Sequence, residues 1–258
     1  TGGNNTAVGF QALQTNNLAG SNNTAVGYQA NRNNTSGNYN VSIGLQTLLS
    51  NTTGTANTAL GYQSLNANTT ADNNTAVGYQ AGYTNSTGTY NTALGRAALK
   101  LNTTASSNTA VGGDAMFETT TGANNTALGA YALNKNTSGA GNVAIGKEAM
   151  YDTTTGSNSV AVGLDALGDN TTASGNVAIG RQALRLNTTG QSHVAIGYRA
   201  GYAVTTASEF TVIGYDAALY STGNSTTAMG RNAMRGVSGS STGPNNTALG
   251  ESSHRDYT

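Results

Sequence analysis

Few side chains in this 258-residue chain could take part in acid–base or nucleophilic chemistry. The chain has two histidines, His193 and His254, and no cysteine. His193 stands where most repeats of a short motif carry Asn, which favours a structural residue over a general base. His254 lies in the C-terminal segment, outside that motif, and neither histidine has an acidic partner and a nucleophile at a recognisable spacing. We therefore expect no enzyme and no cofactor.

Three aspartates invite a metal interpretation because Asp114, Asp165 and Asp216 follow one another at intervals of 51 residues. That interval spans three copies of the repeat described below, or about 14 Å along a stack of strands. Ligands of one Ca²⁺ ion lie within about 2.6 Å of the ion. These carboxylates cannot share an ion within one chain, and we expect no metal site.

The charge of the chain excludes some classes of partner. Eleven basic and eleven acidic residues give a net charge of zero, so the chain has no electrostatic surface for DNA, RNA or an anionic membrane. No run approaches the roughly 18 apolar residues of a membrane helix. We expect no nucleic-acid partner and no membrane insertion by this segment.

A short motif of the form Thr/Val-Ala-Val/Ile/Leu-Gly recurs along the whole chain. Its closing glycine, the repeat glycine, is found at positions 9, 27, 44, 61, 78, 95, 112, 129, 146, 163, 180, 197, 214, 230 and 250. A spacing of 17 residues that is kept for most of the chain predicts a solenoid. We predict an all-β fold, a parallel β-solenoid of about fifteen 17-residue coils over residues 1–250, with 251–258 as a non-repeating exit segment.

The residues before each repeat glycine predict a short strand. One residue before the glycine is apolar and three residues before it is Thr or Val, so these two positions share one face of a strand. β-Branched side chains also favour extended backbone. Parallel stacking at about 4.8 Å would give a rod of roughly 70 Å. We expect the apolar residue before the glycine to enter a thin core, with a Leu or Met from the segment after it.

Alanine occupies the position two residues before nearly every repeat glycine, on the opposite face of the predicted strand. An exposed face would vary among polar residues, so we expect this face to be covered by sister chains. The predicted homotrimer interface therefore consists of Ala25, Ala59, Ala76, Ala93, Ala110, Ala127, Ala144, Ala161, Ala178 and Ala195.

Two turn signals occur in each repeat: an Asn four residues before the glycine, and an Asn-Thr-Thr-Gly stretch after it, as at 51–54. We expect ladders of Asn and Thr side chains at these corners. Directly after the glycine, stretches such as Arg181-Gln182-Ala183-Leu184 fit a second short strand or a single helical turn, and we favour the strand.

An aromatic row follows the repeat glycines and includes Phe10, Tyr28, Tyr62, Tyr79, Tyr198 and Tyr215. Exposed rings could stack on a surface glycan or contact a protein receptor, and they could equally pack across neighbouring coils or chains. Paired threonines such as Thr52-Thr53 suggest an alternative function, an ice-binding or other Thr-rich face. The turn beside each pair argues against it.

Several repeats resemble a known family. NSVAVG at 158–163, GNVAIG at 141–146 and 175–180, and HVAIG at 193–197 resemble the head repeats of YadA-like trimeric autotransporter adhesins. The longer form, NNTAVGYQA at 22–30 and 73–81, is similar to repeats of phage tail fibres that often end in an endosialidase-type intramolecular chaperone. The 17-residue repeat is longer than that of the adhesin heads.

The resemblance implies a left-handed β-roll, three chains around one axis, and an extracellular location on a cell surface or a virion tail. It also implies an adhesive or spacing role. The expected partners are two further copies of the chain and a surface glycan or protein receptor.

Overall fold

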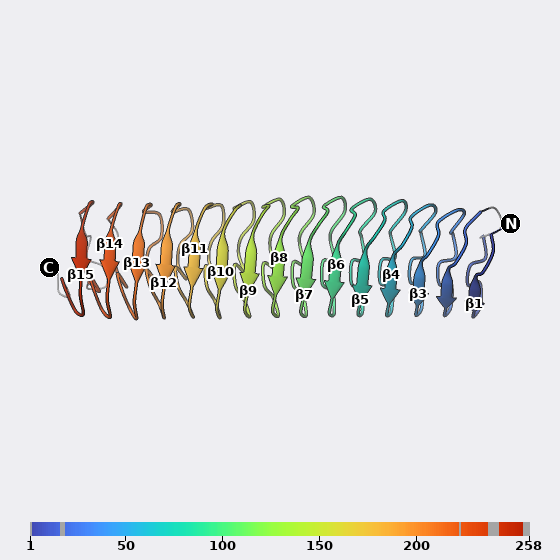
Figure 1. The fold of residues 1–258 in the computed structure, drawn as a ribbon, viewed down its shortest axis with the longest axis horizontal. Coiled ribbons are helices and arrows are strands. Elements are labelled where there is room, and N and C mark those ends of the chain that lie inside the picture. The colour runs from blue at the N-terminus through green and yellow to red at the C-terminus, as the bar shows by residue number, and fades with distance from the viewer. Residues whose placement is uncertain (1, 16–18, 222, 237–242, 255–258) are drawn as a thin grey trace. The chain divides into compact units, whose positions relative to one another are not determined.

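The computed structural model describes residues 2–15, 19–221, 223–236 and 243–254. Every strand in these residues is three residues long and ends directly before a repeat glycine (Figure 1). The strands are β1 (Thr6–Val8), β2 (Thr24–Val26), β3 (Val41–Ile43), β4 (Thr58–Leu60), β5 (Thr75–Val77), β6 (Thr92–Leu94), β7 (Thr109–Val111), β8 (Thr126–Leu128), β9 (Val143–Ile145), β10 (Val160–Val162), β11 (Val177–Ile179), β12 (Val194–Ile196), β13 (Thr211–Ile213), β14 (Thr227–Met229) and β15 (Thr247–Leu249). The predicted fold class, an all-β parallel solenoid, is confirmed.

The chain divides into two units, Thr1–Ala127 and Leu128–Thr258, and each is a stack of coils. In the first unit β1 to β7 pair in parallel, each with the next strand along the chain. In the second unit β9 to β15 pair in the same way. The pairing has no stagger, so equivalent residues of adjacent coils lie side by side, as Leu60 and Val77 do. Each column of the repeat thus becomes a row of side chains.

From β2 to β15 the middle residue of each strand points into the coil and its two neighbours point outward, whereas all three residues of β1 are exposed. Ala59 is fully buried in the single chain, whereas Leu60 is 44% exposed. The prediction that the Val, Ile or Leu directly before the glycine enters the core was therefore wrong, whereas the predicted Leu or Met after the glycine is buried, as at Leu65. The predicted interface was also wrong, because its alanines are at most 2% exposed within one chain and are not available to a partner: Ala25, Ala59, Ala76, Ala93, Ala110, Ala127, Ala144, Ala161, Ala178 and Ala195.

The interior of a coil is narrow and is filled by three kinds of side chain. Small residues enter from the strand and from three residues after the glycine, as Ala76 and Ala81 do. A fully buried Leu or Met enters four residues after the glycine, for example Leu99 and Met116. Asn side chains fill the remaining space at the corners. Small residues and one long aliphatic side chain suit an interior that has to be close-packed at each coil.

The segment after each repeat glycine is a run of turns, so neither the favoured second strand nor a helical turn is correct. Alternate residues adopt left-handed backbone, with φ of 53° at Gln63 and 47° at Leu65. Such conformations cost about 1–2 kcal/mol for a residue with a Cβ. Hydrogen bonds offset this cost, because the Gln63 N–H donates to the Leu45 carbonyl in the preceding coil at 2.9 Å and the Leu65 N–H donates to the Ala81 carbonyl in the next coil at 3.0 Å.

Buried asparagines form the predicted ladders at both corners. Asn40 Oδ1 accepts from the backbone N–H of Asn57 at 3.0 Å and from its side chain at 3.2 Å. At the second corner Asn68 Nδ2 donates to Asn51 Oδ1 at 3.0 Å. The threonines behave differently from the prediction, since the Thr52 hydroxyl donates to the Thr69 backbone carbonyl at 3.1 Å and not to a threonine side chain.

The repeat backbone continues past the boundary expected at residue 250. Ser252 and His254 have φ values of 55° and 51°, which match the left-handed positions of earlier coils. The Ser252 N–H also donates to the Arg231 carbonyl at 2.9 Å. The rest of the predicted exit segment, 255–258, lies outside the described residues. Among the described residues there is no helix of the length and apolarity that crossing a bilayer requires.

Candidate functional site

The most extensive candidate surface is an apolar row on the outer face of the strands. We call it the aliphatic stripe and define it as the residues directly before the repeat glycines. In the first unit these are Val8, Val26, Ile43, Leu60, Val77, Leu94 and Val111, and in the second Leu128, Ile145, Val162, Ile179, Ile196, Ile213, Met229 and Leu249. Within the stacks Leu94 is 46% exposed and Met229 42%, and the exposure is highest at Val8, with 57%, and at Leu249, with 65%. Contiguous exposed apolar side chains of this kind mark interaction sites.

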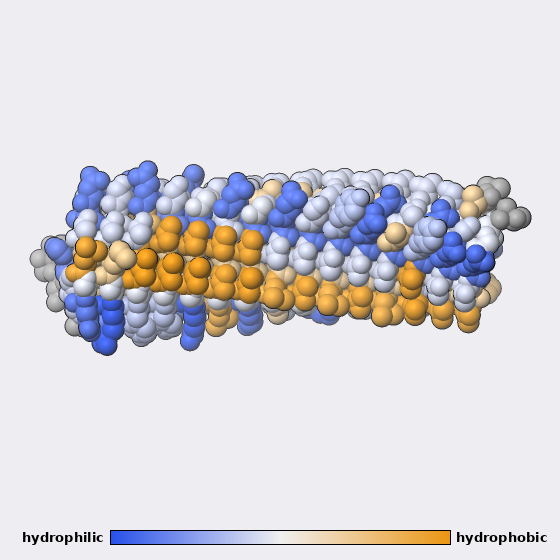
Figure 2. Space-filling model, viewed as in Figure 1, coloured by the Kyte–Doolittle hydropathy of each residue, from blue (hydrophilic) through white to orange (hydrophobic). Residues whose placement is uncertain are grey.

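The aliphatic stripe differs between the two units. In the first unit the outward residue beside it is Thr in every strand except β3. In β9 to β12 that residue is Val, so the apolar surface there is two side chains wide, which Figure 2 shows as two parallel orange rows. The second unit therefore presents the broader apolar face.

The predicted aromatic row is present as three stacked pairs. Ring centroids are 5.5 Å apart for Phe10 and Tyr28, 5.2 Å for Tyr62 and Tyr79, and 5.0 Å for Tyr198 and Tyr215. Other coils carry Leu, Arg, Lys, Gly, Ala or Glu at this position, which interrupts the row. The rings pack across neighbouring coils, which is one of the two expectations, and Tyr79 and Tyr215 also stay about half exposed.

Two further features of the surface were missed from the sequence. Gln side chains form a ladder in which Gln46 Nε2 donates to Gln29 Oε1 and Gln63 Nε2 to Gln46 Oε1, both at 3.0 Å. Tyr39 and Tyr90 are 63% and 64% exposed at a corner position that usually holds Asn or a small residue. The recurrence of Gln two residues after the glycine was the available signal for the ladder.

His193 occupies a place in the buried Asn ladder, as its position in the repeat predicts. The His193 N–H donates to Asn176 Oδ1 at 3.0 Å, and His193 Nδ1 accepts from the Phe210 N–H at 3.1 Å. The imidazole thus replaces an amide oxygen. Desolvation lowers the pKa of His193 from 6.5 to about 4, against an opposing effect of the Ala207 backbone. The ring is fully buried and does not reach the surface.

The three aspartates spaced 51 residues apart lie in separate places. Asp114 forms an ion pair with Arg96, and Asp216 pairs with Arg199 at 2.8 Å. Asp165 lines a surface pocket described next. Across the part of the chain that the structure describes, no group of three or more His, Cys, Asp or Glu side chains could hold a metal ion.

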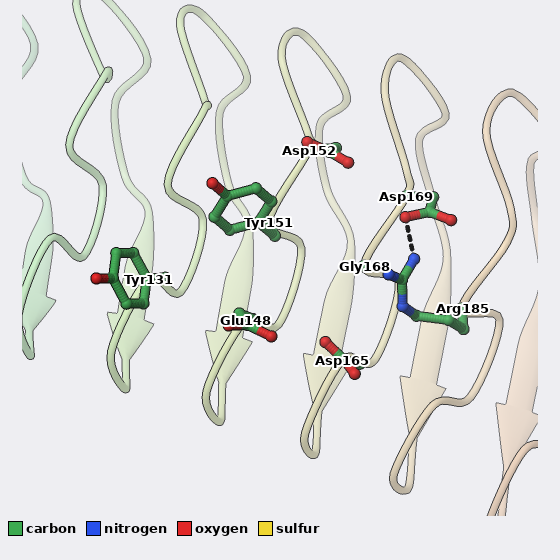
Figure 3. A pocket seen from close by; sticks show the side chains of 8 residues that line it. All are labelled: Tyr131, Glu148, Tyr151, Asp152, Asp165, Gly168, Asp169 and Arg185. Carbon is green, nitrogen blue, oxygen red and sulfur yellow. Dashed lines mark ion pairs between the residues drawn. The ribbon is translucent and has the colours of Figure 1, made fainter.

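An acidic pocket of about 540 Å³ lies in the second unit, lined by Tyr131, Glu148, Tyr151, Asp152, Asp165, Gly168, Asp169 and Arg185. Figure 3 shows Tyr151 on one side of Gly168 and Arg185, which pairs with Asp169, on the other. Neighbouring coils carry Tyr151 or Arg185 at the position of Gly168, so the missing side chain opens the space. A Cβ at Gly168 would lie 2.9 Å from Arg185 Cδ.

The charges of the acidic pocket are largely neutralised within the chain. Besides the pair of Arg185 with Asp169, Lys135 contacts Asp152 at 2.6 Å and Lys147 contacts Glu148 at 3.1 Å. Asp165 lies 3.5 Å from Gln182 Nε2. Lys135 also lies 4.9 Å from the centre of the Tyr151 ring, a cation–π contact. These contacts give each charged side chain a partner, and all of the polar ones except the Lys147–Glu148 pair join adjacent coils.

A second pocket of about 560 Å³ in the same unit has the opposite character. It is lined by Arg199, Tyr215, Asp216, Arg231, Asn232 and Arg235. Sequence reasoning identified Tyr215 and Asp216 and missed the three arginines: Arg199 follows β12 whereas Arg231 and Arg235 follow β14, so Arg199 joins the other two only when the coils stack.

Comparison of the chain with protein-family models, with curated proteins and with solved structures finds no match. The class of protein is therefore defined by the fold alone: the chain is a β-solenoid repeat protein.

Proposed function

We propose that the chain is a structural and adhesive repeat segment of an extracellular homotrimeric fibre, on a bacterial surface or a phage tail. The observation that carries this proposal is the aliphatic stripe, whose side chains are partly exposed in the single chain. Burying what remains exposed of one such side chain is worth on the order of 1 kcal/mol. Repeated at each coil, this contribution favours association along the strand face.

Identical copies are the partners that fit the aliphatic stripe best. Each coil adds the same apolar surface at the same spacing, so a second copy presents a matching row along its length. A closed cyclic arrangement of copies buries the aliphatic stripe of every chain against a neighbouring chain. The number three and the extracellular location come from the resemblance of the repeats to trimeric adhesin heads and tail fibres.

The stripe, and not the buried alanine row, is the face that we assign to the trimer. Light scattering on the purified chain should give three times the 25.9 kDa chain mass. Leu60→Gln combined with Leu94→Gln should shift the mass toward that of a single chain. Leu45→Gln is the matched control, because Leu45 is 41% exposed but lies outside the stripe. A stable monomer, another number of chains, or a trimer that tolerates the stripe variants would contradict the proposal.

A Thr-rich ice-binding face is the second candidate function. The threonines of the strands form a better candidate for this face than the paired threonines at the corners, which were considered first. Thr58, Thr75 and Thr92 lie side by side in register on the outer face of β4 to β6, beside the stripe. In contrast, the first hydroxyl of each Thr pair is used by the backbone, as at Thr52. Thermal hysteresis that Thr75→Lys abolishes would support this candidate, whereas freezing without hysteresis would dismiss it.

A further inference from the structure

The second pocket of Leu128–Thr258 gathers three of the eleven basic residues of the chain. Arg199, Arg231 and Arg235 follow the strands β12, β14 and β14, and Tyr215 and Asp216 follow β13 between them. We call this the arginine pocket. In a chain with so few charges, such a cluster is unlike the rest of the surface.

One carboxylate organises the arginine pocket. Asp216 is only 4% exposed and accepts from Arg199 Nε at 2.9 Å and from Arg199 Nη2 at 2.8 Å. This bidentate geometry is the strong form of an arginine–carboxylate pair. Arg199 therefore neutralises the negative charge of Asp216, so this carboxylate does little to neutralise Arg231 and Arg235.

The remaining two arginines carry the excess positive charge. Arg235 Nε lies 4.0 Å from Asp216 Oδ2 and has no hydrogen-bond partner. Arg231 lies 3.7 Å from Glu251, and both side chains are about two-thirds exposed, which makes this a weak pair. Arg235 is still about one-third exposed and lines the same pocket as Arg231, so an anion between them would contact the exposed parts of both guanidinium groups and compete with Glu251 for Arg231.

An exposed aromatic ring completes the arginine pocket. Tyr215 is 51% exposed and stacks on Tyr198 at 5.0 Å, and Arg199 lies 5.0 Å from the centre of the Tyr198 ring. The ring of Tyr215 is thus held in place by its neighbour and offers an apolar surface beside the positive charge. The apolar face of a sugar ring can pack on such a surface while a charged substituent reaches the guanidinium groups.

We propose that the arginine pocket binds an acidic sugar unit of a glycan, with its carboxylate or phosphate group on Arg231 and Arg235 and its ring on Tyr215. This assignment names the class of ligand that the proposed adhesive segment would bind. Only the origin of the glycan, a surface outside the cell, rests on the proposed function. The acidic pocket around Gly168 has no such excess of positive charge and should not bind this ligand.

The test measures binding of small probes to the full 258-residue chain by ligand-observed NMR. Glucuronic acid and glucose 6-phosphate should bind in the millimolar range, and uncharged glucose should not. Arg235→Gln should weaken both charged probes about tenfold, whereas Arg32→Gln, the same change outside the pocket, should leave them unaffected. Raising the salt concentration should weaken binding because the interaction is between charges.

Tyr215→Ala distinguishes the contribution of the sugar ring to binding from that of the anionic group. It should weaken glucuronic acid and glucose 6-phosphate but leave inorganic phosphate as it was. Inorganic phosphate that binds as tightly as glucose 6-phosphate would overturn the assignment to a sugar, and charged probes indifferent to Arg235→Gln would overturn the site. The melting temperature of each variant verifies that it folds. Because binding is measured per chain, a monomeric protein would contradict the trimer and leave this test intact.

Discussion

Ala59 and Leu60 are neighbours in β4, yet the small side chain of Ala59 is fully buried while the larger Leu60 is 44% exposed. The arrangement repeats from coil to coil because the strands pair without stagger. It means that the coil interior is limited by volume. The apolar surface of the strand that is left outside is the surface that another molecule can cover.

Enlarging the alanine row should therefore destabilise a single chain. Ala59→Leu places three extra carbon atoms between Ser42 and Ala76, its buried partners in the adjacent coils. Overpacking of a dense interior costs about 1–3 kcal/mol. Ala67→Leu is the control, since Ala67 is half-buried at a position where other coils carry Leu101 or Leu186. Urea unfolding should show a loss for Ala59→Leu only, and equal midpoints would contradict a volume-limited interior.

The error in the predicted core has a physical reason. Burial of apolar residues is a one-way rule, because apolar side chains also occur on surfaces. Val, Ile and Leu alternate before the repeat glycine because an outer face accepts side chains of different size. Ala is nearly constant because the narrow interior accepts only a small side chain. The period, the strands and the Asn ladders could be predicted because each follows from a residue type that recurs at one position of most repeats.

The repeat glycines should resist substitution by any residue with a Cβ. Gly61 has φ of 126°, and a Cβ there would lie 2.6 Å from the Gly78 carbonyl oxygen in the next coil. Both the backbone conformation and the contact disfavour alanine. We expect Gly61→Ala to lower the free energy of unfolding by more than about 2 kcal/mol.

Gly113 provides the matched control for Gly61. A Cβ at Gly113 meets nothing within 4 Å, and its φ is not in the left-handed region. Gly113→Ala should therefore change stability little or increase it slightly, by up to about 1 kcal/mol. Chemical denaturation of the two variants compares them directly. Equal losses would show that the close approach of successive glycines does not limit the coil.

The Asn ladder should contribute more to stability than the exposed threonines. Asn57 Oδ1 accepts from the Asn74 N–H at 3.0 Å, and Asn57 Nδ2 donates to the Ala71 carbonyl at 2.8 Å. Asn57→Ala leaves the buried Asn74 N–H unsatisfied, at about 1–3 kcal/mol. The Ala71 carbonyl keeps its second hydrogen bond, from Asn68 Nδ2 at 3.1 Å. Thr53→Ala, at an exposed neighbouring corner, should cost less than about 0.5 kcal/mol. Thermal melting compares the pair, and similar losses would argue against the ladder.

The candidate site was less predictable than the fold, for a reason visible at Arg199 and Arg235. They are 36 positions apart in sequence and share a pocket because their coils stack. The aromatic residues could be placed in one row since they keep the repeat spacing. The arginines occupy different positions within their repeats, so no single column of the sequence pattern contains all of them.

The buried imidazole of His193 should make stability depend on pH. Its pKa is about 4 in the folded chain and 6.5 in the unfolded chain, so between these values the unfolded state binds more protons. Stability is then highest above about pH 6.5 and falls as the pH drops toward 4, by about 2–3 kcal/mol at pH 4.5. His193→Asn restores the residue that most coils carry and removes this titration. Urea unfolding at pH 7.5 and 4.5 should show a smaller acid loss in the variant, because the other titrating groups are common to both proteins. An identical pH dependence would mean that His193 is protonated as readily when folded as when unfolded.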